Sequence, residues 1–195
     1  MIKNIIFDIG NVILTFNRDY LLSHFYQGEE YELLKEKTFF GWEQLDEDSI
    51  SQEDYNKRTA DALPPHLKAS ALAVLNNWEY LMNYNRPIFD LIFELKQKGY
   101  NLYVISNMPF HFIDRDYKFP IFDQFDGKIY SAPLKIVKPD QRIFKILLEK
   151  YNLKGEECVF IDDTKTNLAG AARFGIHTFH YKFNTEELKD YIYSL

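Results

Sequence analysis

Short uncharged runs of β-branched and aromatic residues recur along the chain, separated by longer segments in which apolar residues have helical spacing. Three runs, at residues 5–7, 102–105 and 159–161, predict strands that are buried on both faces. Two weaker runs, at residues 128–130 and 178–180, predict further short strands. We therefore expect a β-sheet whose strands come from distant parts of the chain.

The segment of residues 17–84 shows helical spacing and no strand-like alternation. Ser51 precedes Asp54 in a capping pattern, which predicts a helix that continues towards Leu63. The pair Pro64-Pro65 ends this helix, and another apolar helical face follows it. The segment is roughly 65–70 residues long, a length that suits a small helical bundle.

After residue 85 the predicted strands alternate with helices, which are expected around residues 88–98, 139–151, 165–174 and 186–193. Such alternation predicts an α/β fold, a doubly wound (Rossmann-like) parallel sheet with helices on both faces. The helical segment interrupts the first strand–helix step. We therefore expect a core made of residues 1–16 and 85–195, with residues 17–84 inserted into it.

Composition and charge limit the partners of such a protein. Hydrophobic residues make up 46% of the chain and charged residues 27%, a balance typical of globular proteins. The formal net charge of −6 argues against nucleic acid as the main partner. The single cysteine, Cys158, excludes an intramolecular disulfide and agrees with a reducing compartment. No run approaches the ~18 apolar residues that span a bilayer, so we expect a soluble, cytoplasmic protein without membrane contacts.

Polar residues capable of chemistry follow three of the predicted strands: Asp8, the pair Ser106-Asn107, and the pair Asp162-Asp163. Any one of them could be a helix or turn cap. The carboxyl ends of parallel strands share one edge of the sheet, so together they predict a common crevice. Lys138, at the start of a predicted helix, adds a cation that could reach the same place.

Two or three carboxylates in one crevice repel one another unless a cation lies between them. Carboxylate oxygens without sulfur or imidazole ligands favour a hard ion, most simply Mg²⁺. A hydroxyl, an amide and an ammonium group beside that ion can hold a phosphoryl group. A carboxylate in line with phosphorus could then act as a nucleophile through an aspartyl-phosphate.

The order of these residues resembles the four motifs of the haloacid dehalogenase superfamily, and the resemblance covers essentially the whole chain. The motifs are Phe-Asp-Ile-Gly-Asn-Val at 7–12, Val-Ile-Ser-Asn at 104–107, Lys-Pro-Asp-Gln-Arg-Ile-Phe at 138–144 and Phe-Ile-Asp-Asp-Thr-Lys-Thr-Asn at 160–167. The inserted helices match the position of that superfamily's helical cap. Residues 42–55 further resemble the cap of its bacterial glucose-1-phosphatase-like branch.

The resemblance implies a role for each residue that carries it. Asp8 would be the nucleophile and a metal ligand, and Lys138 would balance charge on the nucleophile and the phosphate. Ser106 and Asn107 would bind the phosphoryl oxygens.

The acidic pair of the fourth motif would serve the metal. Asp163 would ligate Mg²⁺ directly, and Asp162 would act through water or as a supporting partner. Asn167 could orient this pair, or it could equally be a local backbone partner.

One position departs from the common pattern of the family. Most phosphatases of the superfamily carry a second Asp two residues after the nucleophile, as general acid and base, and this chain has Gly10 there. The carbonyl of Gly10 can still ligate the metal, but a proton donor worth typically ~10²–10⁴-fold in rate is missing. Its replacement could be a metal-bound water, a cap residue or His111, although a histidine there is expected on the surface.

The leading hypothesis is a Mg²⁺-dependent phosphatase for a small phosphorylated metabolite, for example a sugar phosphate. The alternative is a 2-haloacid dehalogenase in which Asp8 attacks carbon. That enzyme needs no Mg²⁺ and requires an arginine that binds the substrate carboxylate. Arg18 is the candidate near the cap entrance, but it is expected on the surface. A third hypothesis is a binding module that lost turnover with Gly10. The aromatic and polar residues near the cap entrance are expected to pack within the cap: Phe16, Asn17, Phe39, Phe40 and Trp42.

Overall fold

A computed structural model describes all residues, 1–195, and its centre is a five-stranded sheet in the order β5-β4-β1-β6-β7. The strands are β1 (Asn4–Phe7), β4 (Asn101–Ser106), β5 (Gly127–Tyr130), β6 (Cys158–Asp162) and β7 (His177–His180). Every neighbouring pair is parallel. The predicted α/β, doubly wound fold is therefore confirmed.

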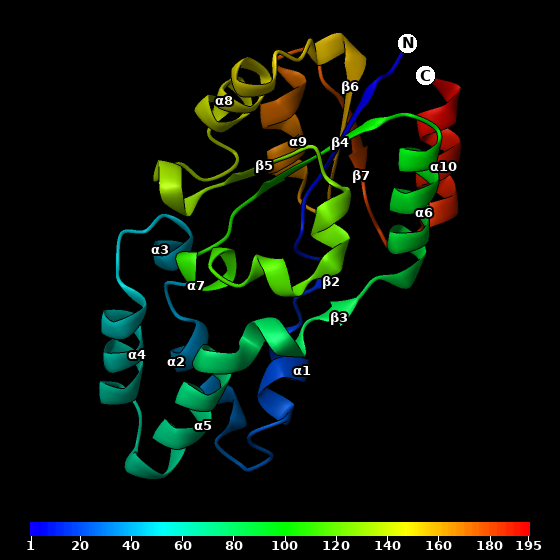
Figure 1. Ribbon diagram of the computed structural model, residues 1–195. Coiled ribbons are helices and arrows are strands. Elements are labelled where there is room, and N and C mark those ends of the chain that lie inside the picture. The colour runs from blue at the N-terminus through cyan, green and yellow to red at the C-terminus, as the bar shows by residue number, and fades with distance from the viewer.

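Burial on both faces explains why the central strand carries no charge. In β1 the side chains of Ile5 and Phe7 join the larger hydrophobic cluster, while Ile6 joins the cluster on the opposite face. Helices α6 (Arg86–Gln97) and α10 (Thr185–Ser194) supply the first cluster. Helices α8 (Gln141–Tyr151) and α9 (Lys165–Ala172) supply the second. Figure 1 shows these two pairs on opposite sides of the sheet.

The inserted segment is helical and lies beside the carboxyl ends of the sheet strands (Figure 1). Its elements are α1 (Arg18–Ser23), α2 (Tyr31–Phe39), α3 (Glu43–Asp46), α4 (Gln52–Asp61), α5 (Pro65–Asn77) and the 3₁₀ turn η1 (Trp78–Leu81). Ser51 caps α4 as predicted, accepting a hydrogen bond from the Asp54 amide at 3.0 Å. We refer to residues 17–84 as the cap; that they form a separate unit stays a prediction.

The expectation that the cap contains no strand is wrong at its end. The two-residue strand β3 (Asn83–Tyr84) pairs antiparallel with β2 (Leu14–Thr15), where the chain leaves the core. A strand of two residues is too short to show alternation. The pairing arises because both crossings between core and cap are brought together in space.

The aromatic stretch after β4 connects the core with the cap. It folds into the short helices α7 (Phe110–Ile113), η2 (Asp116–Lys118) and η3 (Pro120–Gln124). The ring of Phe112 stacks on Trp78 of the cap at 5.9 Å between centroids. Two further 3₁₀ turns, η4 (Ala132–Leu134) and η5 (Gly155–Glu157), precede α8 and β6. No helix has the length and apolar character needed to cross a membrane.

Candidate active site

The three polar strand ends meet at the middle of the sheet. Asp8 directly follows β1, Ser106 ends β4 and Asp162 ends β6, and both β4 and β6 pair with β1. The backbone amide of Asp8 continues the ladder by donating to the Ile161 carbonyl at 2.9 Å. The parallel register therefore brings these side chains to one edge, as the sequence pattern predicts.

The two carboxylate oxygens of Asp8 have different surroundings. Oδ1 accepts from the Ile9 amide at 2.8 Å and the Ser106 hydroxyl at 2.6 Å, and it lies 2.8 Å from Lys138 Nζ. Oδ2 has no hydrogen-bond partner in the protein, and Asp8 lines a cavity. Burial raises the pKa of Asp8 to about 6, although Lys138 opposes this rise. The side chain is held by one oxygen and presents the other.

Lys138 lies between two carboxylates in the interior. Its Nζ is 2.8 Å from Asp8 Oδ1 and 2.7 Å from Asp162 Oδ2, and the residue is only 4% exposed. Burial alone lowers the pKa of a lysine, but the charges of Asp8 and Asp162 outweigh it and raise the pKa of Lys138. The helix expected to start at residues 138–140 begins only at Gln141, capped by Asp140, so Lys138 precedes α8.

Asn107 holds the backbone of Lys138 with its side chain. Its Oδ1 accepts from the Lys138 amide at 2.8 Å, and its Nδ2 donates to the Lys138 carbonyl at 3.1 Å. One amide hydrogen remains for a ligand, because a carboxamide NH₂ has two. Asn107 therefore positions the lysine as well as lining the cavity.

The two acidic residues after β6 have different surroundings. Asp162 is fully buried, and its oxygens accept from Lys138 Nζ, the Thr164 amide and Asn167 Nδ2. Asp163 is half-buried and lines the cavity, with one oxygen 3.0 Å from Asn11 Nδ2. Asn167 thus orients Asp162 through its side chain. Asp163 is the member of the pair that a ligand could reach.

The site fits a hard divalent cation. Carboxylate oxygens of Asp8, Asp162 and Asp163 lie within 4.8 Å of one another. Asp8 and the half-buried Asp163 offer carboxylate oxygens at the cavity, and Gly10 lines the same cavity. Oxygen-only donors of this kind suit Mg²⁺.

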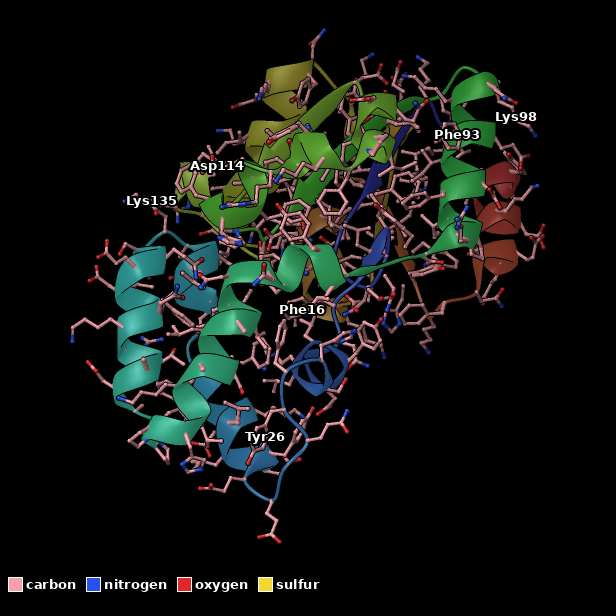
Figure 2. All side chains as sticks on the ribbon, turned by 60° about the horizontal axis from the view of Figure 1, so that its bottom comes forward. Phe16, Tyr26, Phe93, Lys98, Asp114 and Lys135 are labelled. Carbon is pink, nitrogen blue, oxygen red and sulfur yellow. The ribbon has the colours of Figure 1, made fainter.

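The cavity has a volume of about 260 Å³ and lies between the core and the cap. Its core side carries the groups described above, and its cap side carries Trp42, Asp46 and Trp78. Phe16 lies at the junction between the two parts (Figure 2). Arg18, expected on the surface, is exposed but also lines the cavity. A cavity of this size suits a small metabolite.

The residues expected to pack within the cap have different outcomes. Phe16 and Trp42 pack on each other at 5.3 Å between ring centroids, and both also face the cavity. Phe39 is buried, whereas Phe40 is 66% exposed. Asn17 caps α1 by accepting from the Tyr20 amide.

His111 is not the surface residue that the sequence suggested. Its side chain is 8% exposed, and its Nε2 lies 2.9 Å from Oε2 of the fully buried Glu79. It does not line the cavity. This pairing with the cap removes His111 from the candidates for a proton donor.

Sequence reasoning gave no site role to five residues that line the cavity: Asn11, Asp46, Trp78, Met108 and Thr164. Asn11 lies within the first motif, so its closeness in sequence to Asp8 and Gly10 could have indicated a place in the site. Asp46 belongs to a run of acidic residues in the cap, and nothing in the local pattern distinguishes it from the others.

A family model described as haloacid dehalogenase-like hydrolase matches residues 2–175. This match takes in β1, β4, Lys138 and β6, the parts that build the site. The chain belongs to this family of hydrolases.

Curated relatives include phosphatases. The chain is 26% identical to D-ribitol-5-phosphate phosphatase of Bacteroides thetaiotaomicron, over 92% of this chain and 91% of that protein. It is 27% identical to bifunctional epoxide hydrolase 2 of Rattus norvegicus over 91% of this chain, but the match spans only 33% of that longer protein.

Solved structures share the fold. A HAD family enzyme of Bacteroides thetaiotaomicron, in complex with magnesium and inorganic phosphate, superposes with a TM-score of 0.76 at 23% identity, covering 94% of this chain and 96% of that one. A dehalogenase structure superposes with a TM-score of 0.70 at 18% identity, covering 91% and 83%. The HAD family enzyme and the dehalogenase therefore share this fold, so the fold alone does not distinguish between the two reactions.

Proposed function

We propose that this protein is a Mg²⁺-dependent phosphatase for a small phosphorylated metabolite, with residues 17–84 acting as a cap over the site. The observation that carries the proposal is the asymmetry of Asp8. Three donors hold Oδ1, while Oδ2 is unpartnered in a carboxylate that lines the cavity. A carboxylate fixed in this way is ready to attack phosphorus.

In this mechanism Asp8 Oδ2 forms a bond to phosphorus and the alcohol leaves, after which water releases phosphate from Asp8. Ser106 and Lys138 prevent the carboxylate from rotating during the attack. The remaining amide hydrogen of Asn107 is available to a phosphoryl oxygen. Bound Mg²⁺, held by Asp8, Asp163 and the Gly10 carbonyl, would neutralise negative charge on the phosphoryl group.

The acidic pair favours phosphate transfer over dehalogenation. Asp163 presents a half-buried carboxylate to the cavity, where it would repel a haloacid carboxylate in the absence of a metal ion. In a Mg²⁺-dependent phosphatase the same carboxylate would be a metal ligand. The phosphatase relative described above supports a sugar or polyol phosphate as the substrate class.

The test is phosphate release from a panel of phosphorylated metabolites, with Mg²⁺ and with chelator. We expect release that requires Mg²⁺ and disappears in Asp8→Asn. Asp114→Asn, which changes an exposed carboxylate after α7 (Figure 2), is the matched control and should retain activity. Halide release that persists in chelator, or stabilisation by Mg²⁺ and phosphate without turnover, would overturn the proposal.

A further inference from the structure

Gly10 has no side chain that could serve as a general acid at this position. A Cβ built on Gly10 would meet no atom within 4 Å, so the space beside this residue is open. The alcohol leaving group needs a proton as its bond to phosphorus breaks. A donor from elsewhere in the cavity could reach this open space.

Asp46, the last residue of α3, is a cavity-lining carboxyl group with no partner. Its Oδ1 is buried and makes no hydrogen bond, and the residue forms no ion pair. A buried polar atom without a partner is rare in native proteins and requires an explanation. Burial without a donor disfavours the charged form, so the environment of Oδ1 favours a protonated Asp46.

The backbone of Asp46 is fixed to the core. Its carbonyl accepts from the hydroxyl of Ser131 at 2.6 Å, and Ser131 itself is fully buried and accepts from the Met108 amide at 2.9 Å. A second contact joins Lys135 Nζ to Asp48 Oδ2 at 3.3 Å. Figure 2 shows Lys135 next to the cap helices. The segment that carries Asp46 is therefore attached to the core at two points, Asp46 itself and Asp48.

The surroundings of Asp46 favour its protonated form. Burial and, to a lesser degree, the charge of Asp8 raise the pKa of its carboxyl group to about 8, although Lys138 opposes this rise. The ionisable groups around it are Asp8 and Lys138 from the core, Glu43 and Glu47 from its own segment, and Arg18 and Asp163 in the same cavity. At neutral pH the group can therefore both donate and accept a proton.

We propose that Asp46 is the general acid and base of the reaction, supplied by the cap in place of the side chain missing at Gly10. This inference rests on the proposed phosphatase function. It follows from the unpartnered Oδ1, the cavity that both residues line and the open space above Gly10.

The proton is conserved over the two half-reactions. First, a bond forms between Asp8 Oδ2 and phosphorus, the bond from phosphorus to the ester oxygen breaks, and that oxygen takes the proton of Asp46. The alcohol leaves and Asp46 becomes a carboxylate. Next, Asp46 takes one proton from the attacking water, the water oxygen bonds to phosphorus, and the bond to Asp8 breaks. Hydrogen phosphate leaves, and both aspartates return to their starting forms.

The test uses two aryl phosphates of similar size whose leaving groups differ in basicity, p-nitrophenyl phosphate and phenyl phosphate. In Asp46→Asn we expect kcat/KM for phenyl phosphate to fall by ~10²–10³-fold, because its leaving group needs the proton. For p-nitrophenyl phosphate the fall should be less than about tenfold, since nitrophenolate leaves without one. Glu53→Gln, an exposed carboxylate of the cap helix α4, is the control and should behave as the unchanged protein.

A rescue variant separates catalysis from folding. Gly10→Asp, added to Asp46→Asn, should recover much of the phenyl phosphate activity, because the space beside Gly10 is open. Equal losses for both aryl phosphates in Asp46→Asn, or no loss, would overturn the role of Asp46 while leaving the phosphatase proposal intact. If the unchanged protein releases phosphate neither from these two compounds nor from any member of the metabolite panel, both proposals are overturned.

Discussion

Removing the buried cation of the site should destabilise the fold sharply. Lys138→Met keeps a long apolar side chain but takes the positive charge away from Asp8, at 2.8 Å, and Asp162, at 2.7 Å. Breaking a buried ion pair by removing one partner costs about 3–5 kcal/mol, because a buried charge is left without compensation. For a chain of this size the melting temperature should fall by about 6–20 °C.

The measurement is urea unfolding followed by circular dichroism, at pH 7 and at pH 5. At pH 5 the loss of unfolding free energy caused by Lys138→Met should be smaller than at pH 7, because protonation of Asp8 removes one of the uncompensated charges. Lys135→Met is the matched control: this side chain is 69% exposed, and its pair with Asp48 should contribute only about 0–1 kcal/mol. If Lys138→Met loses no more stability than Lys135→Met, the argument for a charge-compensated buried site is wrong.

Three further predictions follow from packing, titration and metal binding. Gly155→Ala should destabilise the protein by about 1–3 kcal/mol or more, since the new Cβ would lie 1.8 Å from the Phe174 carbonyl oxygen, whereas Gly10→Ala should be tolerated in the same denaturation assay. The Asp46 pKa rises from 3.8 to about 8 on folding, so the folded state binds this proton more tightly and the free energy of unfolding should fall as the pH rises from 4 to 8. Asp46→Asn should lack this part of the fall, and equal pH slopes in both proteins would contradict the assignment. Mg²⁺ should stabilise the folded protein by ~2.7 kcal/mol at a concentration one hundred times its Kd, and so raise the melting temperature. In a thermal-shift titration, Asp163→Asn should lose most of this rise.

The fold was largely predictable because its signals are local. A strand buried on both faces has no place for charge, so the uncharged runs marked β1, β4 and β6. The two-residue strand β3 was missed, since two residues show no alternation. The start of α8 was placed a few residues early, because Asp140 rather than Lys138 caps it.

The site was predictable only in part. The polar residues at the strand ends were found because parallel strands end at one edge of the sheet, a rule that needs no coordinates. His111 was misplaced, because its partner Glu79 lies 32 residues away in the cap. Arg18 was expected only at the surface, and its position in the cavity lining depends on how the cap meets the core.

By itself the sequence determined the α/β fold, the order of the site residues and the absence of a side-chain acid at Gly10. Each of these depends on residue type, local period or the parallel-sheet rule. Only the tertiary structure decided which Asp8 oxygen is unpartnered, that Asp162 is fully engaged by protein donors, and that Asp46 lines the same cavity. Those facts depend on contacts between distant segments, such as Ser131 with Asp46 across 85 residues. No local pattern encodes such contacts, because they form only when the cap packs against the sheet edge.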